Sequence, residues 1–567
     1  MKLETWIPGL ATFRNYRREW FRSDLVAGLS LAAVALPIGI AYAQLAGFPP
    51  VVGIYSCILP PVAYALFGSS RQLVVNPDAA ACAIVAATVA PLAAGDALRY
   101  SDLSVVLTLL TGLFCIAGGL AGLGVIANFL SRPILTGYLN GIALSIIVGQ
   151  LGTLLGFKVA SAGFFRTLWN VAIHLKETHL ATLLIGLSLF ALLRILKHVA
   201  PRLPAPLIAA AIGCTAVYVL QLTNQGVAVV GPVPAGFSLP RVPSIQAHEL
   251  GPIAFGAAGI VLVSFCSMMT TARGFASKNG YSIKVNQDMA ALGVSDLVSG
   301  LSNGFVVSGA DSRTAVVDSS GGKTQVASVV GSVEMALVLV FLTSPLAYLP
   351  TAALAAILIS SATGLFDFHS LRDYYRVSPS EFRFSLVAML GVMTIGVLPG
   401  VLIAVGLALL KLLRYASRPH DAQLGMMNGK PDSFVTLEEG GKSIPGLIIY
   451  RFDASLVFFN ADYFKDRVHA VMADADKNAR WFLFDVEAMS LLDYTGMDAL
   501  ENLRVELAKS GIVFAIARAK GLCFVMLQRS GLIERIGVEH CFPSVHAGAQ
   551  SFLRHSRDRL VPTTNHP

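Results

Sequence analysis

The chain has 567 residues, of which 55% are hydrophobic and only 13% charged, against about 25% charged in an average soluble domain. Its formal net charge is +8, but within the apolar region the Lys and Arg residues lie mainly in the turns between apolar segments, which indicates a membrane protein rather than a nucleic-acid-binding one. The seven cysteines are scattered, with no CxxC or Cys/His spacing, so neither a zinc site nor a disulfide framework is predicted. We expect no metal, no cofactor and no enzymatic activity.

Apolar segments follow one another from Asp24 to about Leu410, and segments of roughly 18 apolar residues can cross a bilayer as helices. The first set is expected near 24–45, 50–67, 77–93, 103–127, 133–155, 178–199 and 204–222. The second set is expected near 252–273, 287–301, 311–320, 324–346, 350–363, 381–397 and 399–416. The predicted fold class is therefore a polytopic α-helical membrane protein, with about 14 transmembrane helices in two sets of about seven.

The distribution of Lys and Arg predicts the orientation of the chain. Residues 1–22 form a basic N-terminal segment, and the transmembrane domain covers 23–417, with repeats at about 23–225 and 250–417. Alternate turns are rich in Lys and Arg, and the loops between them hold few. The positive-inside rule therefore places both termini in the cytoplasm, and we expect a multi-pass protein of the cell membrane.

Two of the apolar segments are short and begin unusually. Residues 73–80 read LVVNPDAA and residues 305–312 read FVVSGADS, and the two Val-Val pairs are about 232 residues apart. Matched Pro- or Gly-interrupted segments in the two halves indicate a transporter site built on half-helices. In an inverted repeat their N-termini would face each other, which favours an anion between them. The alternative is that Pro and Gly merely kink two membrane helices.

The region after Arg418 has the composition of a soluble domain. Strands expected near 444–452, 481–486 and 513–517 alternate with helices near 460–473, 496–509 and 520–530, which predicts a small α/β sheet. We expect a polar linker over 418–443, the α/β domain over 444–557 and a tail over 558–567.

Several motifs resemble those of one transporter family. They are DLVAG at 24–28, AYAQLAGFPP at 41–50, GIY at 53–55, YALFGSSR at 64–71, NGY at 279–281, NQD at 286–288 and SRTA at 312–315. On these residues the chain is identified as a member of the sulfate permease (SulP) family, which is related to animal solute carrier family 26. The resemblance covers nearly the whole chain, and the tail resembles the STAS domain that such transporters carry.

The resemblance implies a seven-plus-seven inverted repeat with core and gate domains, and usually a homodimer. It also implies an anion site between the starts of the third and tenth helices, with contributions from the first and eighth. In this sequence the implied substrate-binding residues are Ile38, Tyr42, Pro77, Asp78, Ala79, Ser267, Thr271, Gly309, Ala310, Asp311, Ser312 and Arg313.

The chain departs from the family pattern at these positions. Many members have Pro-Gln where Pro37 and Ile38 stand, and an acidic residue that couples to a cation or proton where Ser267 stands. Acids appear instead at Asp78 and Asp311. The identity of the anion and of any coupling ion is therefore left open by the sequence.

Each of these polar residues has two or more interpretations. Asp78 and Asp311 are expected either to cap half-helices, to couple a proton or cation, or to pair with Arg313. Arg313 is interpreted as an anion anchor or as a counter-ion of Asp311. Ser267 and Thr271 share a helix face and either offer hydroxyls to the substrate or bond back to helix carbonyls.

In the tail, the turn Asp493-Tyr494-Thr495-Gly496 matches the place where STAS regulators carry a phosphorylatable hydroxyl, here Thr495. Phosphorylation would add about two negative charges at a helix N-terminus. The alternative is a plain capping turn formed by Asp493.

The sequence favours a secondary transporter of a small inorganic anion that works by alternating access and is regulated by the STAS domain. Sulfate is the default substrate, with bicarbonate, chloride or a dicarboxylate as alternatives, and a proton is the candidate coupling ion. Expected partners are this anion, membrane lipid, a second copy of the chain and a cytoplasmic regulator. Two rival hypotheses are a proton-coupled nucleobase-type transporter of the same membrane fold and a membrane-tethered STAS signalling protein.

Overall fold

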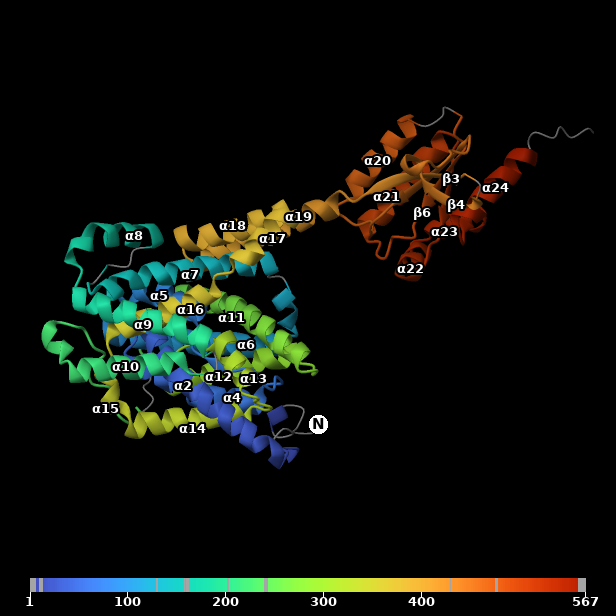
Figure 1. Ribbon diagram of the computed structural model, residues 1–567. Coiled ribbons are helices and arrows are strands. Elements are labelled where there is room, and N and C mark those ends of the chain that lie inside the picture. The colour runs from blue at the N-terminus through green and yellow to red at the C-terminus, as the bar shows by residue number, and fades with distance from the viewer. Residues whose placement is uncertain are drawn as a thin grey trace, which may run out of the picture. The chain divides into compact units, whose positions relative to one another are not determined.

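The computed structural model describes residues 7–9, 14–128, 131–157, 159, 163–200, 203–238, 243–428, 430–474 and 478–558. The chain divides into two compact units, Met1–Leu407 and Ala408–Pro567; in Figure 1 the first runs from blue to yellow and the second from orange to red. Nearly all of the expected tail, 558–567, and part of the expected N-terminal segment, 1–22, lie outside the described residues.

Helices of the first half of the membrane unit follow the predicted apolar segments closely. They are α2 (Phe21–Leu45), α3 (Pro50–Tyr55), α4 (Leu59–Phe67), α5 (Ala79–Ala93), α6 (Ala97–Leu120), α7 (Arg132–Leu155), α8 (Phe164–Ile173), α9 (Leu180–Val199) and α10 (Ala205–Val219). The short α8 was not expected, because it lies in a loop of mixed composition between two spans.

The second half continues in the same way. Its helices are α11 (Leu250–Lys278), α12 (Val285–Leu301), α13 (Asp311–Ser319), α14 (Val326–Phe341), α15 (Thr343–Leu346), α16 (Thr351–Leu365), α17 (Phe368–Val377), α18 (Pro379–Thr394) and α19 (Val397–Ser417). Within the described residues, seven helical segments are long and apolar enough to cross a membrane, and three further apolar helices are shorter. Every predicted apolar segment overlaps at least one helix.

The membrane helices pack into two groups, each drawn from both halves of the chain. The first group contains α2 to α6 and α11 to α14, and the second contains α7, α9, α10, α16 and α18. Close helix approach depends on small residues in the first group: a Cβ on Gly112 of α6 would lie 2.7 Å from the Gly293 carbonyl oxygen of α12. The groups meet where α2 contacts α10 and α16 and where α5 contacts α7.

Buried carboxylates hold the first group together at the residues of the sequence motifs. Asp24 of α2 accepts hydrogen bonds from the backbone N–H of Lys323 (2.6 Å) and from the hydroxyl of Thr324 (2.7 Å), just before α14. Asp288 of α12 accepts from the hydroxyl of Tyr64 (3.0 Å) and the N–H of Ser69 (2.6 Å). These motif residues therefore position helices, and they lie outside the cavity described below.

A two-stranded ribbon lies at the centre of the first group. Strand β1 (Val75–Asn76) pairs antiparallel with β2 (Ser308–Gly309), with Val75 opposite Gly309. Helices α5 and α13 follow β1 and β2, so they leave the ribbon at its two opposite ends. A Cβ on Gly309 would lie 2.5 Å from the Met268 Cγ of α11, which explains why glycine stands there.

The second unit is a six-stranded mixed sheet with the strand order β4-β3-β5-β6-β7-β8. The strands are β3 (Asp421–Met427), β4 (Lys430–Thr436), β5 (Leu447–Phe452), β6 (Trp481–Asp485), β7 (Val513–Ala517) and β8 (Cys541–Phe542). Strands β5 to β8 are parallel, while β3 pairs antiparallel with both β4 and β5.

Alternate strand residues face opposite sides of this sheet, as the strand period of two requires. Residues such as Tyr450, Phe482 and Phe484 pack against α20 (Ala461–Asp474), α21 (Tyr494–Lys509), α22 (Gly521–Arg529) and α23 (Leu532–Ile536). On the other face, Ile449 and Leu483 pack against α24 (Val545–Asp558).

The expectation of a polar linker over 418–443 is wrong, because this segment supplies β3 and β4. Asp421 of β3 accepts hydrogen bonds from the Tyr450 hydroxyl (3.0 Å) and the Arg467 Nε (2.9 Å), which ties the segment to β5 and α20. Burial, and then the Asp421 carboxylate, raise the pKa of Tyr450, so its phenol remains a neutral donor. Pairing to β5, rather than local hydrophobicity, makes the segment a strand.

Candidate functional site

A cavity of about 690 Å³ lies in the membrane unit between the two helix groups. Its lining comes from the starts of α5 and α13 and from α2, α7, α9, α10, α11 and α16. Ten of the predicted substrate-binding residues line it, namely Ile38, Tyr42, Asp78, Ala79, Ser267, Thr271, Ala310, Asp311, Ser312 and Arg313. The two half-helix starts, more than 230 residues apart in sequence, therefore face one common cavity.

Two predicted residues, Pro77 and Gly309, do not line the cavity. Gly309 lies in β2 against Met268 of α11, where its role is close packing. The Pro77 carbonyl accepts a hydrogen bond from the Arg313 guanidinium. Both residues therefore contact neighbours of the cavity rather than the cavity itself.

At the start of α5, Asp78 caps its own helix. Its backbone is extended, and its Oδ2 accepts a hydrogen bond from the Ala80 N–H (3.2 Å). This is the geometry of an N-cap, so the capping interpretation holds for Asp78. Ala79 and Ala80 follow it, and their small side chains leave the N-terminus of α5 open to the cavity.

At the start of α13 the aspartate makes a different contact. Asp311 is the first residue of the helix, the preceding Ala310 has no capping side chain, and the Asp311 carboxylate accepts a hydrogen bond from the Thr271 hydroxyl of α11. The Ser267 carbonyl lies 3.3 Å from the same hydroxyl oxygen. The capping interpretation therefore does not hold for Asp311, which instead joins α13 to α11.

Arg313 is the buried cation of the cavity, with 2% of its surface exposed. Its guanidinium carbon lies 5.4 Å from the centre of the Tyr42 ring, a cation–π contact between α13 and α2. One terminal nitrogen donates to the Pro77 carbonyl, and Nε has no hydrogen-bond partner among the described residues. Among the described residues, no ion pair within 4 Å joins Arg313 to Asp311.

Several further cavity residues were not predicted from the sequence. Lys197 of α9 and the hydroxyls of Thr270, Ser360 and Ser361 also line it. In the sequence, Lys197 is one of the Lys and Arg residues whose distribution predicts the orientation of the chain. Its position near the C-terminal end of an apolar helix is the one sequence signal that could have identified Lys197 as a cavity residue. The sequence around the two serines of α16 contains no such signal.

The STAS turn lies at the start of α21. Asp493 is the N-cap: its two oxygens accept hydrogen bonds from the N–H groups of Gly496 and Phe458, each at 2.8 Å. A Cβ on Gly496 would lie 2.4 Å from the Leu456 carbonyl oxygen, so only glycine fits there. Thr495 is exposed, and its hydroxyl has no hydrogen-bond partner among the described residues. The capping interpretation thus holds for Asp493 and leaves Thr495 accessible.

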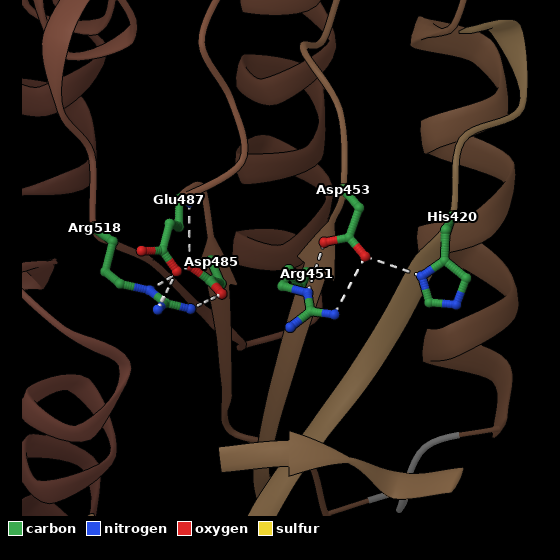
Figure 2. Close-up of polar contacts among 6 residues, drawn as sticks. All are labelled: His420, Arg451, Asp453, Asp485, Glu487 and Arg518. Atoms are coloured by element: carbon green, nitrogen blue, oxygen red, sulfur yellow. Dashed lines mark hydrogen bonds and ion pairs between the residues drawn. The ribbon is translucent and has the colours of Figure 1, made fainter. Parts of the chain in front are cut away.

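Charged residues gather at the carboxyl ends of the parallel strands of the STAS sheet, as Figure 2 shows. Arg518, after β7, pairs with the fully buried Asp485 of β6 and with Glu487. Asp453, after β5, contacts both Arg451 (2.7 Å) and His420 (3.0 Å). These pairs fix the strand ends, and no group of His, Cys, Asp and Glu among the described residues is arranged to hold a metal ion.

Comparison with known proteins agrees with this architecture. Residues 21–388 match the sulfate permease family, and residues 442–548 match the STAS domain. A probable sulfate transporter of Mycobacterium tuberculosis is 40% identical over 550 residues, which cover 97% of this chain and 98% of the relative. Sulfate transporter 1.1 of Arabidopsis thaliana is 30% identical, covering 95% and 87% respectively.

Solved structures share the fold. The murine Solute Carrier 26 family member A9 anion transporter, in its inward-facing state, superimposes with a TM-score of 0.92 at 23% identity, covering 97% of this chain and 94% of that one. The transmembrane domain of a cyanobacterial bicarbonate transporter, BicA, gives a TM-score of 0.61 at 22% identity, covering 69% of this chain and 98% of that one. The protein is thus a multi-pass membrane protein with a C-terminal STAS domain, and it belongs to the sulfate permease family of anion transporters.

Proposed function

We propose that this protein transports sulfate across the cell membrane by alternating access, with the anion bound in the cavity between the starts of α5 and α13. The single observation that carries the proposal is the buried Arg313, whose Nε has no hydrogen-bond partner among the described residues while its side chain lines a cavity that two helix N-termini also face. A cation and helix N-termini together favour an anion. The named activity of the 40% identical relative supports sulfate.

Hydroxyls complete the proposed anion site. Ser312, Ser360 and Ser361 line the cavity and can donate hydrogen bonds to the oxygens of a tetrahedral anion. Bicarbonate, chloride and dicarboxylates are the competing substrates. Movement of the first helix group past the second would expose the site to each side in turn, as in other transporters built from repeats.

The coupling ion in this proposal is a proton carried by Asp311. Ser267 cannot carry a charge, whereas the Asp311 carboxylate lines the cavity beside Arg313. Both termini are placed in the cytoplasm by the Lys and Arg distribution. We also propose a homodimer, as in other members of the family.

Uptake into proteoliposomes tests the function directly. Labelled sulfate should accumulate when a proton gradient is imposed, unlabelled sulfate should compete better than bicarbonate, chloride or succinate, and a sodium gradient should add nothing. Stronger competition by another anion would show that this anion, rather than sulfate, is the substrate. Absence of uptake for every anion, with protein of unchanged folding, would refute transport.

The STAS turn is proposed as the regulatory site. Thr495→Glu should change the uptake rate by about two- to five-fold, and Thr495→Ala should change it less, because a charge at a helix N-terminus is worth about 0.3–1 kcal/mol. The exposed Ser510 at the other end of α21 gives the control variant Ser510→Glu. Since β3 begins at Asp421, a deletion that removes the whole domain covers residues 418–567. If all these variants and the deletion had the uptake rate of the wild type, the STAS domain would not be a regulator of transport.

A further inference from the structure

A second cavity, the lateral groove, has a volume of about 680 Å³, within the range of about 300–1,000 Å³ typical of small-molecule sites. It lies between α2 and α14 of the first helix group and α10 of the second, and it shares no lining residue with the central cavity. Leu29, Leu337 and Leu342 line it and are 46%, 50% and 54% exposed. Exposed leucines in and beside apolar helices are expected to face lipid, so we expect the groove to open toward the bilayer.

The lining is almost wholly aliphatic, with two polar side chains besides the Cys214 thiol. Thr215 is one of them, and its hydroxyl donates to the Ala211 carbonyl of its own helix (2.9 Å). Glu334, at the middle of α14, is the other, and its carboxyl group has no hydrogen bond or ion pair within the described residues. A carboxylate at membrane depth costs several kcal/mol unless it is paired, and by default it marks a functional site.

A second acceptor lies on the α2 wall of the groove. Pro37 lies inside the continuous helix α2, and because proline has no N–H, it cannot donate the helical hydrogen bond to the carbonyl of Ala33, four residues earlier. Ala33 and Pro37 both line the groove. The groove therefore combines an apolar wall with a carboxylate and a carbonyl that lacks its usual helical donor, and both groups can accept hydrogen bonds.

We propose that the lateral groove binds a primary alkylamine that enters from the bilayer, its chain on the aliphatic wall and its ammonium on Glu334 and the Ala33 carbonyl. An ammonium group supplies three donors and a positive charge, which match these acceptors. No aromatic side chain lines the groove, so a quaternary ammonium has no aromatic cage there.

The position of the groove gives the bound amine a consequence for transport, and this part rests on the proposed function. The amine contacts α2 and α14 on one side and α10 on the other, so it bridges the two helix groups. Alternating access requires these groups to move past each other. A bound alkylamine therefore holds one conformation and inhibits uptake.

Binding is tested with full-length protein in liposomes and a dodecylamine that carries a diazirine at its chain end. Photolabelling, mapped by mass spectrometry, should fall on residues 207–215 of α10. Dodecylamine should compete for the label and dodecanol should not, and Glu334→Gln should weaken labelling by about ten-fold. Ala211→Phe, which fills the groove, should abolish labelling, whereas Ile212→Phe, exposed on the same helix but outside the lining, should keep it.

Equal labelling of wild type and Glu334→Gln, equal competition by dodecanol, or label spread evenly over lipid-facing helices would overturn the site. Uptake measured in the same liposomes separates the two parts of the proposal. Dodecylamine should inhibit the wild type and Ile212→Phe but not Ala211→Phe. Specific labelling without any inhibition would overturn the bridging role, and specific labelling of a protein that transports no anion would refute the proposed function while leaving the site intact.

Discussion

The starts of α5 and α13 are related by the pseudo-symmetry of the fold, yet they carry different chemistry. Both follow a strand of the same two-stranded ribbon and both face the central cavity. Asp78 is engaged by its own helix as an N-cap, whereas Asp311 and Arg313 reach other elements, α11 and the α2–β1 region. The repeat thus duplicates a backbone device, whereas the polar contacts that reach α11, α2 and the Pro77 carbonyl come from its second copy.

Blocking the α13 start should have the largest effect. Ala310 is 1% exposed and lines the cavity, so Ala310→Phe would fill the approach to the helix N-terminus and abolish uptake. The lipid-exposed Val333→Phe on α14 is the control and should transport normally. Labelled uptake, with size-exclusion chromatography as the folding check, measures both. Normal uptake by Ala310→Phe would remove the α13 start from the site.

Removing the cation should come next. A hydrogen bond to a charged group contributes about 1.5–3 kcal/mol, so Arg313→Gln should weaken the apparent affinity for the anion roughly ten- to hundred-fold. Arg313→Lys keeps the charge without the planar guanidinium, so its apparent affinity for the anion should lie between those of the wild type and Arg313→Gln. Concentration-dependent uptake gives the values. An unchanged affinity in Arg313→Gln would leave Arg313 with only a packing role against Tyr42.

Substitution of Asp311 should change the pH dependence of uptake more than the affinity for the anion. If Asp311 carries the proton of a symporter, uptake rises as the external pH falls, and Asp311→Asn makes it independent of pH. The test is uptake by the wild type and by Asp311→Asn at external pH values from about 5 to about 8. Strict dependence on sodium, or an unchanged profile in Asp311→Asn, would assign coupling to another residue.

The matched substitution in the first repeat should have the smallest effect. Asn caps a helix about as well as Asp, so Asp78→Asn should alter uptake by less than about three-fold and leave the pH profile intact. Asp78→Ala loses the cap and should lower the free energy of unfolding by about 1 kcal/mol, visible as a lower thermal midpoint. A pH profile that disappears in Asp78→Asn would show that the two acids are equivalent after all.

Local sequence patterns were enough to predict the membrane fold, the two interrupted half-helices and most of the strands and helices of the STAS domain. These follow from local signals: apolar length, Pro and Gly positions, and the periods of helix and strand. The pattern at 305–312 and its counterpart at 73–80 predicted the two helix starts that line the cavity, since a helix start is encoded by neighbouring residues.

The partner of each polar group, in contrast, depends on how distant segments pack together. Thr271 and Asp311 are 40 residues apart and Arg313 and Pro77 are 236 apart, so no local pattern separates a capping aspartate from one held by another helix. The same holds for β3, which is a strand because it pairs with β5, and for Lys197 and Glu334, whose cavities form only when helices from both groups pack together. Local sequence sets the conformation of each segment, whereas the energy of its polar side chains depends on contacts that packing alone provides.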